Sequence, residues 1–158
     1  KGRSSKGIKG IELSKDDSVI DLSLVNSVNV NPQTAKKMLK NGSKNTDKAA
    51  EIIAKQKYIL SVTENGFGKR TSSYQFRVTN RGGSGIMCIT TSSRNGNVLA
   101  SFPVGHDDDI MLITKSGQLI RCPVIDIRVA GRNTQGVSIF KTSDSEKVVS
   151  ASRVEIEN

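Results

Sequence analysis

Short apolar stretches separated by turn residues recur along the chain, and each has the length of a single strand. Residues 110–114 (Ile-Met-Leu-Ile-Thr) predict a buried strand, and Ser116-Gly117 predicts the turn that follows it. Further strands are predicted after that turn, at 118–122, 137–141 and 147–153. The last third of the chain therefore predicts four short strands.

The same pattern is present in earlier parts of the chain. Tyr58-Ile-Leu-Ser-Val-Thr63 corresponds to Asp109-Ile-Met-Leu-Ile-Thr114, 51 residues later. The same offset carries Gly66 onto Gly117, Arg70 onto Arg121, and 80–89 onto 131–140. Residues 98–104 match 148–154 at an offset of 50, and 2–11 and 19–25 match the last unit at an offset of 129. A match sustained over whole units indicates an internal repeat.

Four short strands in a period near 50 residues are typical of propeller-like blades, and a solenoid fits this period less well. We therefore predict an all-β fold whose blades each have four antiparallel strands. The units are the second half of a blade at 1–25, a complete blade at 58–108, and a complete terminal blade at 109–158. Because the first unit is partial, we expect further chain to precede it in the parent protein.

An insertion at 26–57 interrupts the repeat. Asn31-Pro32 predicts a capped helix start, with a helix over 33–40, and Asn41-Gly42 ends it. A second helix is predicted over 46–55, with Ala49, Ile52 and Ile53 on its inner face. The insertion is rich in lysine, so it either adds contacts to DNA or is a solvated decoration.

Composition and charge exclude several classes of function. A net charge of +9 and a pI near 9.8 indicate a polyanionic partner, while 4% aromatic residues and no Trp give little for base stacking. No apolar run approaches the roughly 20 residues of a membrane span, and no signal peptide is recognisable. Cys88 and Cys122 lack metal-binding spacing, and His106 beside Asp107 is typical of a solvated turn. We expect no catalytic, cofactor or metal site in this chain.

The basic residues recur at equivalent places. Arg70 and Arg121 share one position on the second strand, and Arg3, Arg81 and Arg132 share another in a glycine-bearing loop. Cations repeated on stacked blades can follow the phosphates of a duplex without reading its sequence. For any one of these residues a solvated turn is the simpler interpretation, but the set predicts phosphate binding. The candidate DNA-binding residues are Lys69, Arg70, Arg77, Arg81, Arg121, Arg128, Arg132, Arg3, Lys6 and Lys9.

Three runs carry a family resemblance: Ile59–Thr71, Ile110–Arg121 and Gly131-Arg-Asn-Thr-Gln-Gly-Val137. The most specific part of the first is Asn65-Gly-Phe-Gly-Lys-Arg-Thr71. They closely resemble the C-terminal domain of bacterial DNA gyrase A. The resemblance implies a β-pinwheel, a ring of six propeller-like blades that exchange a strand with their neighbours, of which this chain would be about two and a half. Arg81-Gly-Gly-Ser-Gly85 only partly matches the family's Gln-Arg-Arg-Gly-Gly-Lys-Gly box, which lies outside this chain.

The resemblance also implies a function. The basic rim of that family wraps duplex DNA for a type II DNA topoisomerase that introduces negative supercoils, with ATP and Mg²⁺ used elsewhere in the holoenzyme. Its partners would be duplex DNA, the rest of gyrase A, and gyrase B, in the cytoplasm at the nucleoid. The DNA-cleaving tyrosine belongs to another part of the parent protein, so Tyr58 and Tyr74 are not expected to act as it.

Two alternatives remain from the sequence. The C-terminal DNA-binding domain of topoisomerase IV is a close relative with fewer blades, although Asn65–Thr71 and Gly131–Val137 are more like gyrase. A propeller-type scaffold that binds an acidic protein would also be basic, but it would not need arginines repeated at this spacing. The open edge of a half blade also predicts self-association.

Overall fold

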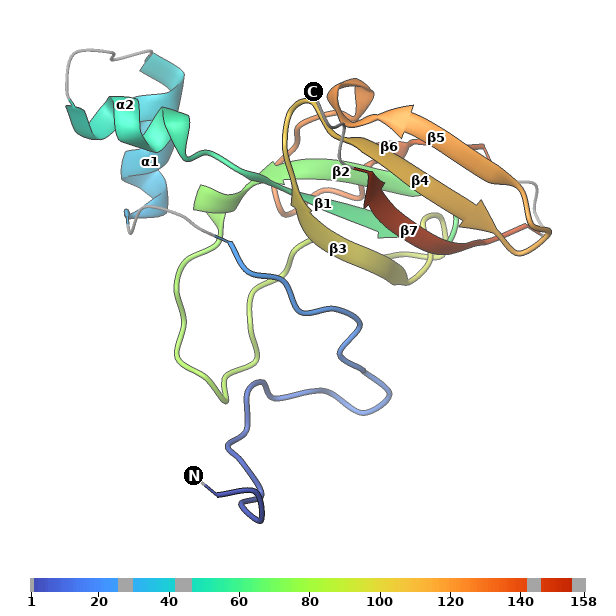
Figure 1. Ribbon diagram of the computed structural model, residues 1–158, viewed down its shortest axis with the longest axis horizontal. Helices are drawn as coiled ribbons and strands as arrows, with labels where there is room; N and C mark the ends of the chain where they lie inside the picture. The colour runs from blue at the N-terminus through green and yellow to red at the C-terminus, as the bar shows by residue number, and fades with distance from the viewer. Residues whose placement is uncertain (1, 26–29, 42–46, 142–145, 155–158) are drawn as a thin grey trace.

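The computed structural model of the protein describes residues 2–25, 30–41, 47–141 and 146–154. Its elements in chain order are the helices α1 (Pro32–Asn41) and α2 (Asp47–Ala54), followed by strands and two short 3-10 helices. These are β1 (Tyr58–Thr63), β2 (Phe67–Ser72), η1 (Ser73–Gln75), β3 (Val98–Val104), β4 (Asp109–Thr114), β5 (Leu119–Pro123), η2 (Val124–Asp126), β6 (Val137–Ser138) and β7 (Val148–Val154). Figure 1 shows the strands as two sheets packed together, with the helices at one end.

Both sheets are antiparallel and repeat one arrangement. The first has the order β3-β1-β2-β6 and the second the order β5-β4-β7. The central strands β1 and β4 each pair with the next strand and with the last strand of their own unit. A register shift interrupts the β1–β3 ladder at Val62/Thr63 and the β4–β7 ladder at Ile113/Thr114, which are equivalent places. The antiparallel, propeller-like class predicted from the repeat is confirmed.

Strand β6 crosses from one unit to the other. It lies in the sequence of the unit 109–158, yet Ser138 pairs with Phe67 and Val137 with Gly68 on β2. Gly68 allows this approach, because a Cβ there would lie 2.4 Å from Ile139 Cδ1 and 2.6 Å from the Ser61 carbonyl oxygen. The strand expected at 137–141 is therefore shorter than predicted and completes the sheet of the preceding unit.

The main core lies between the two sheets. Leu60 and Val62 of β1 pack with Ile110 and Leu112 of β4, and each of these side chains is fully buried. Val104, Val124, Ile127 and Val148 close the same cluster. Burial of a large aliphatic side chain contributes about 1.5–3 kcal/mol, so the two units stabilise each other through this shared core.

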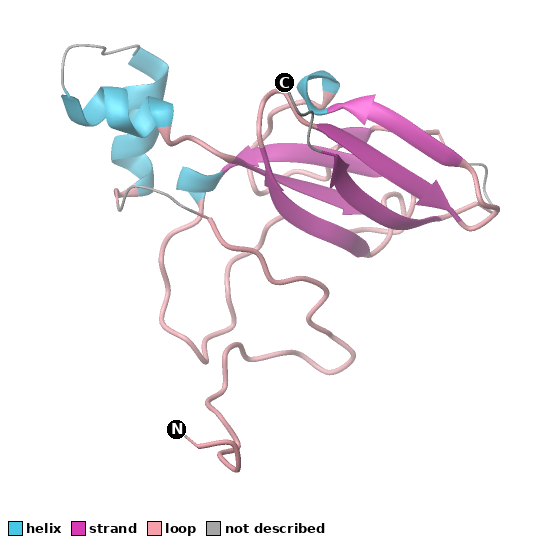
Figure 2. Ribbon diagram, viewed as in Figure 1, coloured by secondary structure: helices cyan, strands magenta, loops and turns pink. Residues whose placement is uncertain are grey.

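The helices form a separate small unit beside η1 (Figure 2). Ala35 of α1, Ile52 of α2 and Tyr74 of η1 are buried together, and the Tyr74 hydroxyl donates to the Ile52 carbonyl at 3.0 Å. The Asn31 side chain accepts a hydrogen bond from the Gln33 N–H at 2.9 Å, which is the predicted cap. The two helices are therefore confirmed, but Ile53, expected on the inner face, is 42% exposed.

The first segment, residues 2–25, contains no strand (Figure 2). Its apolar side chains are exposed: Leu22 and Leu24 are each 91% exposed. Residues 19–25 correspond by repeat to β3 and β7, which pair with β1 and β4, but among the described residues no such central strand lies beside them. Two backbone hydrogen bonds join the segment to the loop at 80–85, from Glu12 N–H to the Gly83 carbonyl (2.9 Å) and from Gly82 N–H to the Gly10 carbonyl (2.7 Å).

Candidate functional site

The glycine-bearing loops have one shared backbone feature. Gly7, Gly85 and Gly136 occupy the same position of the repeat, and their φ angles are 77°, 76° and 79°. A side chain would be strained in this left-handed conformation. At Gly136 a Cβ would also lie 2.7 Å from the Gly68 carbonyl oxygen. Glycine is required there because the loop turns against β2.

We call residues 127–134 the basic loop, since it carries Arg128 and Arg132 and lies along β2. Arg70 and the loop exchange two backbone hydrogen bonds, from Arg70 N–H to the Arg128 carbonyl (3.0 Å) and from Ala130 N–H to the Arg70 carbonyl (2.8 Å). The Thr71 hydroxyl donates to the Ala130 carbonyl at 3.0 Å. The loop of one unit is thus fastened to a strand of the unit before it.

Lys69 holds the later part of the basic loop from inside. Its side chain is fully buried, and its ammonium donates to the carbonyls of Gly131 (2.5 Å) and Arg132 (2.6 Å) and to the Thr134 hydroxyl (3.2 Å). Burial lowers the pKa of Lys69, and the nearby charge of Arg132 lowers it further, while the coulombic effect of Cys88 opposes this. Because backbone carbonyls accept hydrogen bonds from its ammonium, this lysine acts as an internal clamp.

Arg70 holds the earlier part of the loop. The residue is only 6% exposed; its Nε donates to the Ile127 carbonyl at 2.7 Å, and Nη2 donates to the Ile125 carbonyl at 3.0 Å. Its guanidinium also lies over the Tyr58 ring, 5.3 Å from the centroid. Desolvation by burial lowers the pKa of Arg70.

These contacts differ from the sequence-based expectation for Lys69 and Arg70. Both were expected on an exposed basic edge, but both are buried with their charged groups turned to backbone carbonyls. Consecutive residues of a strand point to opposite faces, so a Lys-Arg pair predicts at least one exposed cation. Here strand β2 is covered on both faces, and the carbonyls that receive the two cations come from residues about 60 positions later. A local pattern carries no signal of this.

The two arginines of the basic loop differ from these buried cations and from each other. Arg128 is exposed and makes no ion pair or side-chain hydrogen bond among the described residues. Arg132 is half-buried; its guanidinium donates to the Met87 carbonyl at 2.8 Å, and its N–H donates to the Gln75 side chain at 3.3 Å. The backbone carbonyls of the loop therefore face inward to buried cations, while Arg128 faces solvent.

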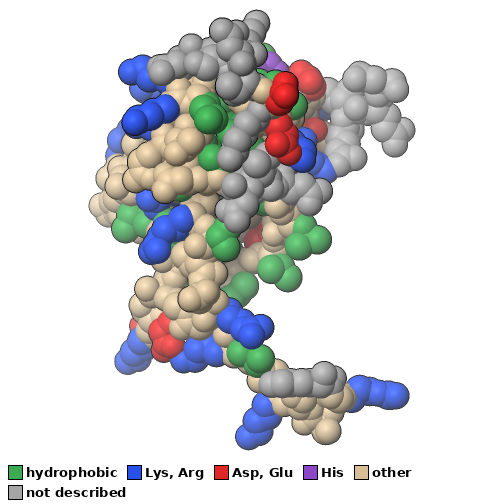
Figure 3. Space-filling model, turned by 90° about the vertical axis from the view of Figure 1, so that its left-hand side faces the viewer, with side chains coloured by type: hydrophobic (Ala, Val, Ile, Leu, Met, Phe, Trp, Pro, Cys, Tyr) green, Lys and Arg blue, Asp and Glu red, His purple; other side chains and the backbone are tan. Residues whose placement is uncertain are grey.

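The remaining predicted residues lie on exposed segments. Arg77 and Arg81 flank a shallow hollow formed by residues 77–85, and both are exposed. The N-terminal segment, which contacts that loop, carries the exposed Arg3, Lys6 and Lys9, the last paired with Glu12. Figure 3 shows a face on which Lys and Arg side chains extend from the helices at the top to the N-terminal segment at the bottom, with fewer acidic side chains.

Arg121 differs from its repeat equivalent Arg70. Its side chain is 55% exposed and pairs with Asp109, Nε to Oδ2, at 2.6 Å. No described segment covers β5 in the way that the basic loop covers β2, and so Arg121 remains at the surface.

Residues that could support other kinds of chemistry lie apart from one another. The described ranges contain no group of three or more His, Cys, Asp or Glu side chains placed to hold a metal ion. His106 is an exposed turn residue with Nδ1 3.3 Å from Asp107, and both cysteines are free thiols. Among the described helices, none is long and apolar enough to span a membrane.

Comparisons with known proteins agree on one family. The family model described as "DNA gyrase C-terminal domain, beta-propeller" matches residues 1–26, 57–104 and 108–155, which leaves out the helical insertion. DNA gyrase A of Rickettsia typhi is 40% identical over 174 aligned residues that cover 98% of this chain and 19% of that protein. DNA gyrase A of Haemophilus influenzae is 37% identical, over 97% of this chain and 17% of that protein.

Solved structures give the same result. A structure of the DNA gyrase A C-terminal domain has a TM-score of 0.57 and 28% identity, covering 61% of this chain and 33% of that one. The C-terminal domain of DNA topoisomerase IV has the same fold, with a TM-score of 0.57, 21% identity, and cover of 63% of this chain and 31% of that one. The chain spans about a fifth of the length of the curated relatives it matches. This chain belongs to the family of DNA gyrase C-terminal domains.

Proposed function

We propose that this chain binds duplex DNA through the phosphate backbone, along the surface formed by the arginines of residues 77–85 and of the basic loop together with the N-terminal cations. We call this the basic face; its members are Arg77, Arg81, Arg128, Arg132, Arg3, Lys6 and Lys9. Family membership supports DNA as the partner, since the matched relatives are components of DNA gyrase. The observation that carries the proposal is the basic loop, whose carbonyls are bound from inside by Lys69 and Arg70 and whose Arg128 is left facing solvent.

The buried Lys69 and Arg70 should favour DNA binding by Arg128 because they hold the basic loop in place before DNA binds. A free loop would lose conformational entropy when it docks on DNA, and a loop already fastened to β2 has lost it on folding. Arg77, Arg81 and Arg128 carry no partner among the described residues, so a phosphate meets no competing carboxylate there. Arg121 is less available, because Asp109 already pairs with it.

Contacts of this kind give affinity without reading sequence. Arginine and lysine bind phosphate oxygens, which are the same at every base pair, and release counterions from the duplex. Bending 20–30 base pairs along a curved surface costs about 1–6 kcal/mol, so several contacts are needed to offset it. We propose that this chain contributes part of such a curved path.

The role in the whole protein follows as a proposal. The chain would serve a type II topoisomerase that wraps DNA and introduces negative supercoils, together with the rest of gyrase A and with gyrase B. The ATP- and Mg²⁺-dependent steps would take place in those other parts. This chain would supply DNA contacts to them.

A salt titration tests the DNA-binding proposal. The chain is titrated with random-sequence linear duplexes of increasing length at several salt concentrations. We expect tighter binding to longer duplexes and a log–log salt slope of about −0.9 for each phosphate contacted. The variant R77Q/R81Q/R128Q should reduce that slope by about 2 to 3. Absence of binding at low salt would refute the proposal, and binding that ignores duplex length would favour a scaffold for an acidic protein.

A further inference from the structure

We infer that helix α1 of the insertion is a second DNA-contacting element, which binds the phosphate backbone next to the basic loop. The inference rests on the proposed DNA binding and extends it to a segment that the family model does not match. Its contact residues are Lys36, Lys37 and Lys40. Their charge, their place in the fold and their position relative to Arg132 support this assignment.

The charge of α1 is uncompensated. The helix has the sequence Pro-Gln-Thr-Ala-Lys-Lys-Met-Leu-Lys-Asn and contains no acidic residue. Lys36, Lys37 and Lys40 are exposed and make no ion pair among the described residues, whereas Lys55 of α2 pairs with Glu51 at 2.9 Å. Lys36 and Lys40 are one turn apart, so they share a face and repel each other. Binding of a polyanion would relieve this repulsion.

The lysines also lie on one side of the helix. Ala35 is fully buried, and Met38 and Leu39 pack on the cluster that contains Ile52 and Tyr74. At 100° per residue, Lys36, Lys37 and Lys40 then fall together on the side away from that cluster. The outward face of α1 is therefore basic, and the packing of its inward face holds the lysines toward solvent.

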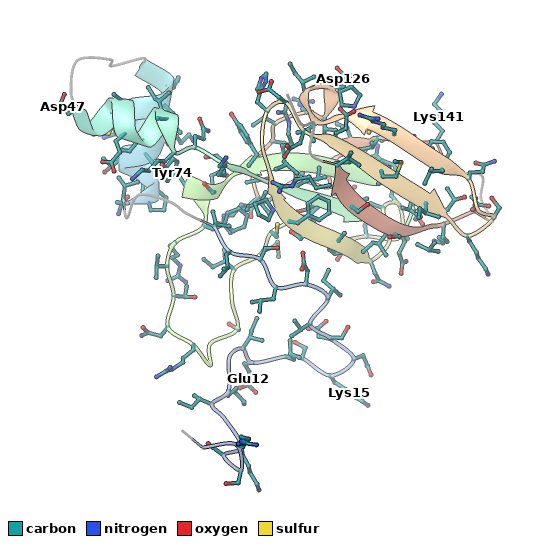
Figure 4. All side chains as sticks on the ribbon, in the orientation of Figure 1. Glu12, Lys15, Asp47, Tyr74, Asp126 and Lys141 are labelled. Carbon is teal, nitrogen blue, oxygen red and sulfur yellow. The ribbon has the colours of Figure 1, made fainter. Side chains whose placement is uncertain are left out.

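The helix pair is fastened to the blade beside the basic loop. Tyr74 and Gln75 are adjacent in η1. The Tyr74 hydroxyl donates to the Ile52 carbonyl of α2, and the Gln75 side chain accepts from the N–H of Arg132 at 3.3 Å. In Figure 4 Tyr74 lies at the base of the helices. Two consecutive residues thus hold the helices and the loop in a fixed relation.

A groove joins the two elements. Its α1 wall is formed by Pro32, Gln33 and Lys36, and its opposite wall by Gln75 and residues 129–132, including Arg132. The groove has a volume of about 500 Å³, and its lining contains cations from both walls and no carboxylate. A phosphate between Lys36 and Arg132 would therefore face positive charge on both sides. A solvated decoration would need neither the shared anchor nor this arrangement.

The test compares two variants with the same change in net charge. K36Q/K37Q/K40Q removes the α1 lysines and keeps good helix formers. K15Q/K115Q/K141Q removes three exposed lysines away from the helices; Lys15 and Lys141 are labelled in Figure 4. Both are titrated against a random-sequence linear duplex of about 30 base pairs at several salt concentrations.

We expect the α1 variant to reduce the salt slope by about 2 to 3, whereas the control should reduce it by less than about 1. Because the loss is in the slope, the DNA affinities of the α1 variant and the wild type should converge toward 1 M salt. At 0.1 M salt these affinities should differ by up to about 500-fold. In the wild type, acetylation of Lys36, Lys37 and Lys40 should slow when DNA is bound, while acetylation of Lys115 should not.

Other outcomes overturn the inference in distinguishable ways. If the α1 variant binds like the wild type, or if both variants lose the same slope, α1 makes no specific contact and the proposed function stands. If the wild type does not bind at low salt, the proposed function fails and the inference fails with it. Circular dichroism of the α1 variant shows whether the helices are still formed.

Discussion

Replacement of Lys69 by Met tests whether this buried lysine is an internal clamp. Methionine is unbranched and of similar length, so it can fill the same space without the charge. The change leaves the carbonyls of Gly131 and Arg132 without their buried donor. It also removes the Lys69 ammonium as a donor to the Thr134 hydroxyl.

The magnitude follows from two opposing effects. A carbonyl that loses its partner costs about 1–3 kcal/mol, and a hydrogen bond to a charged group contributes about 1.5–3 kcal/mol. Removal of a buried ammonium also relieves its desolvation, which costs several kcal/mol. The Gly131 carbonyl keeps a donor after the change, because the Thr134 hydroxyl also donates to it at 2.9 Å. We therefore expect the free energy of unfolding to fall by about 1–3 kcal/mol.

The assay is amide hydrogen exchange of the free protein, combined with urea unfolding. The Thr90 N–H donates to the Thr134 carbonyl at 3.1 Å, so it reports on the loop that Lys69 holds. We expect its exchange to rise by about 5- to 150-fold in K69M, the factors that correspond to about 1–3 kcal/mol. The amides of the β4–β5 ladder should not change beyond the global effect. K115M, at an exposed lysine, is the matched control.

A direct DNA contact by Lys69 predicts another result. In that case K69M would weaken DNA binding, while exchange of the Thr90 amide in the free protein would be the same as in the wild type. That outcome would refute the clamp. If K69M loosens the loop without DNA present and also weakens binding, the lysine acts through the position of the arginines.

Three further predictions concern other parts of the fold. G136A should destabilise the protein by more than G117A. Both glycines have a positive φ (79° and 85°), but only at Gly136 would a Cβ lie 2.7 Å from a carbonyl oxygen. Urea unfolding measures the difference, and equal losses of stability would contradict the prediction. E146Q should flatten the acid side of the stability curve: the Ser116 N–H bond (2.9 Å) lowers the pKa of Glu146, so its contribution is present above the ordinary value of 4.5 and is lost as pH falls through the lower folded pKa. A curve of unchanged shape below pH 4.5 would show that this bond is absent in solution. R121Q should lower the free energy of unfolding by about 1 kcal/mol or less, since the Arg121 side chain is 55% exposed, while its partner Asp109 is 13% exposed. A loss above about 2 kcal/mol would contradict this.

Structural elements could be predicted from the sequence where the signal is local or repeated. The offset of 51 residues identified β1 and β4 as equivalent strands, and likewise β2 and β5, because equivalent strands must bury equivalent side chains. The cap at Asn31 could be predicted because it depends on residues two positions apart. The helices of the insertion followed from these local signals.

The sequence did not predict whether a strand forms, or which sheet it joins, where that depends on a segment distant in the chain. Residues 19–25 have the alternation of a strand, but a strand also needs a partner for its backbone groups, and none of the described strands lies there. Strand β6 has the pattern of its own unit, yet it pairs with β2, where Gly68 leaves room for it. Pattern gives the conformation of a strand and not the sheet that it joins.

The basic positions show how a repeat can give one residue two roles. Lys69 and Arg70 correspond to Ile120 and Arg121 in the next unit. The basic loop covers β2, so the first pair is buried and binds carbonyls, while no described segment covers β5, and Arg121 remains 55% exposed. A cation at this position stabilises the contact between units when the following loop covers it, and stays at the surface when it does not, as Arg121 does in its ion pair with Asp109. The repeated arginines are therefore not interchangeable: substitutions on β2 should act first on stability and only through it on DNA binding, whereas substitutions at Arg77, Arg81 and Arg128 should act on binding alone.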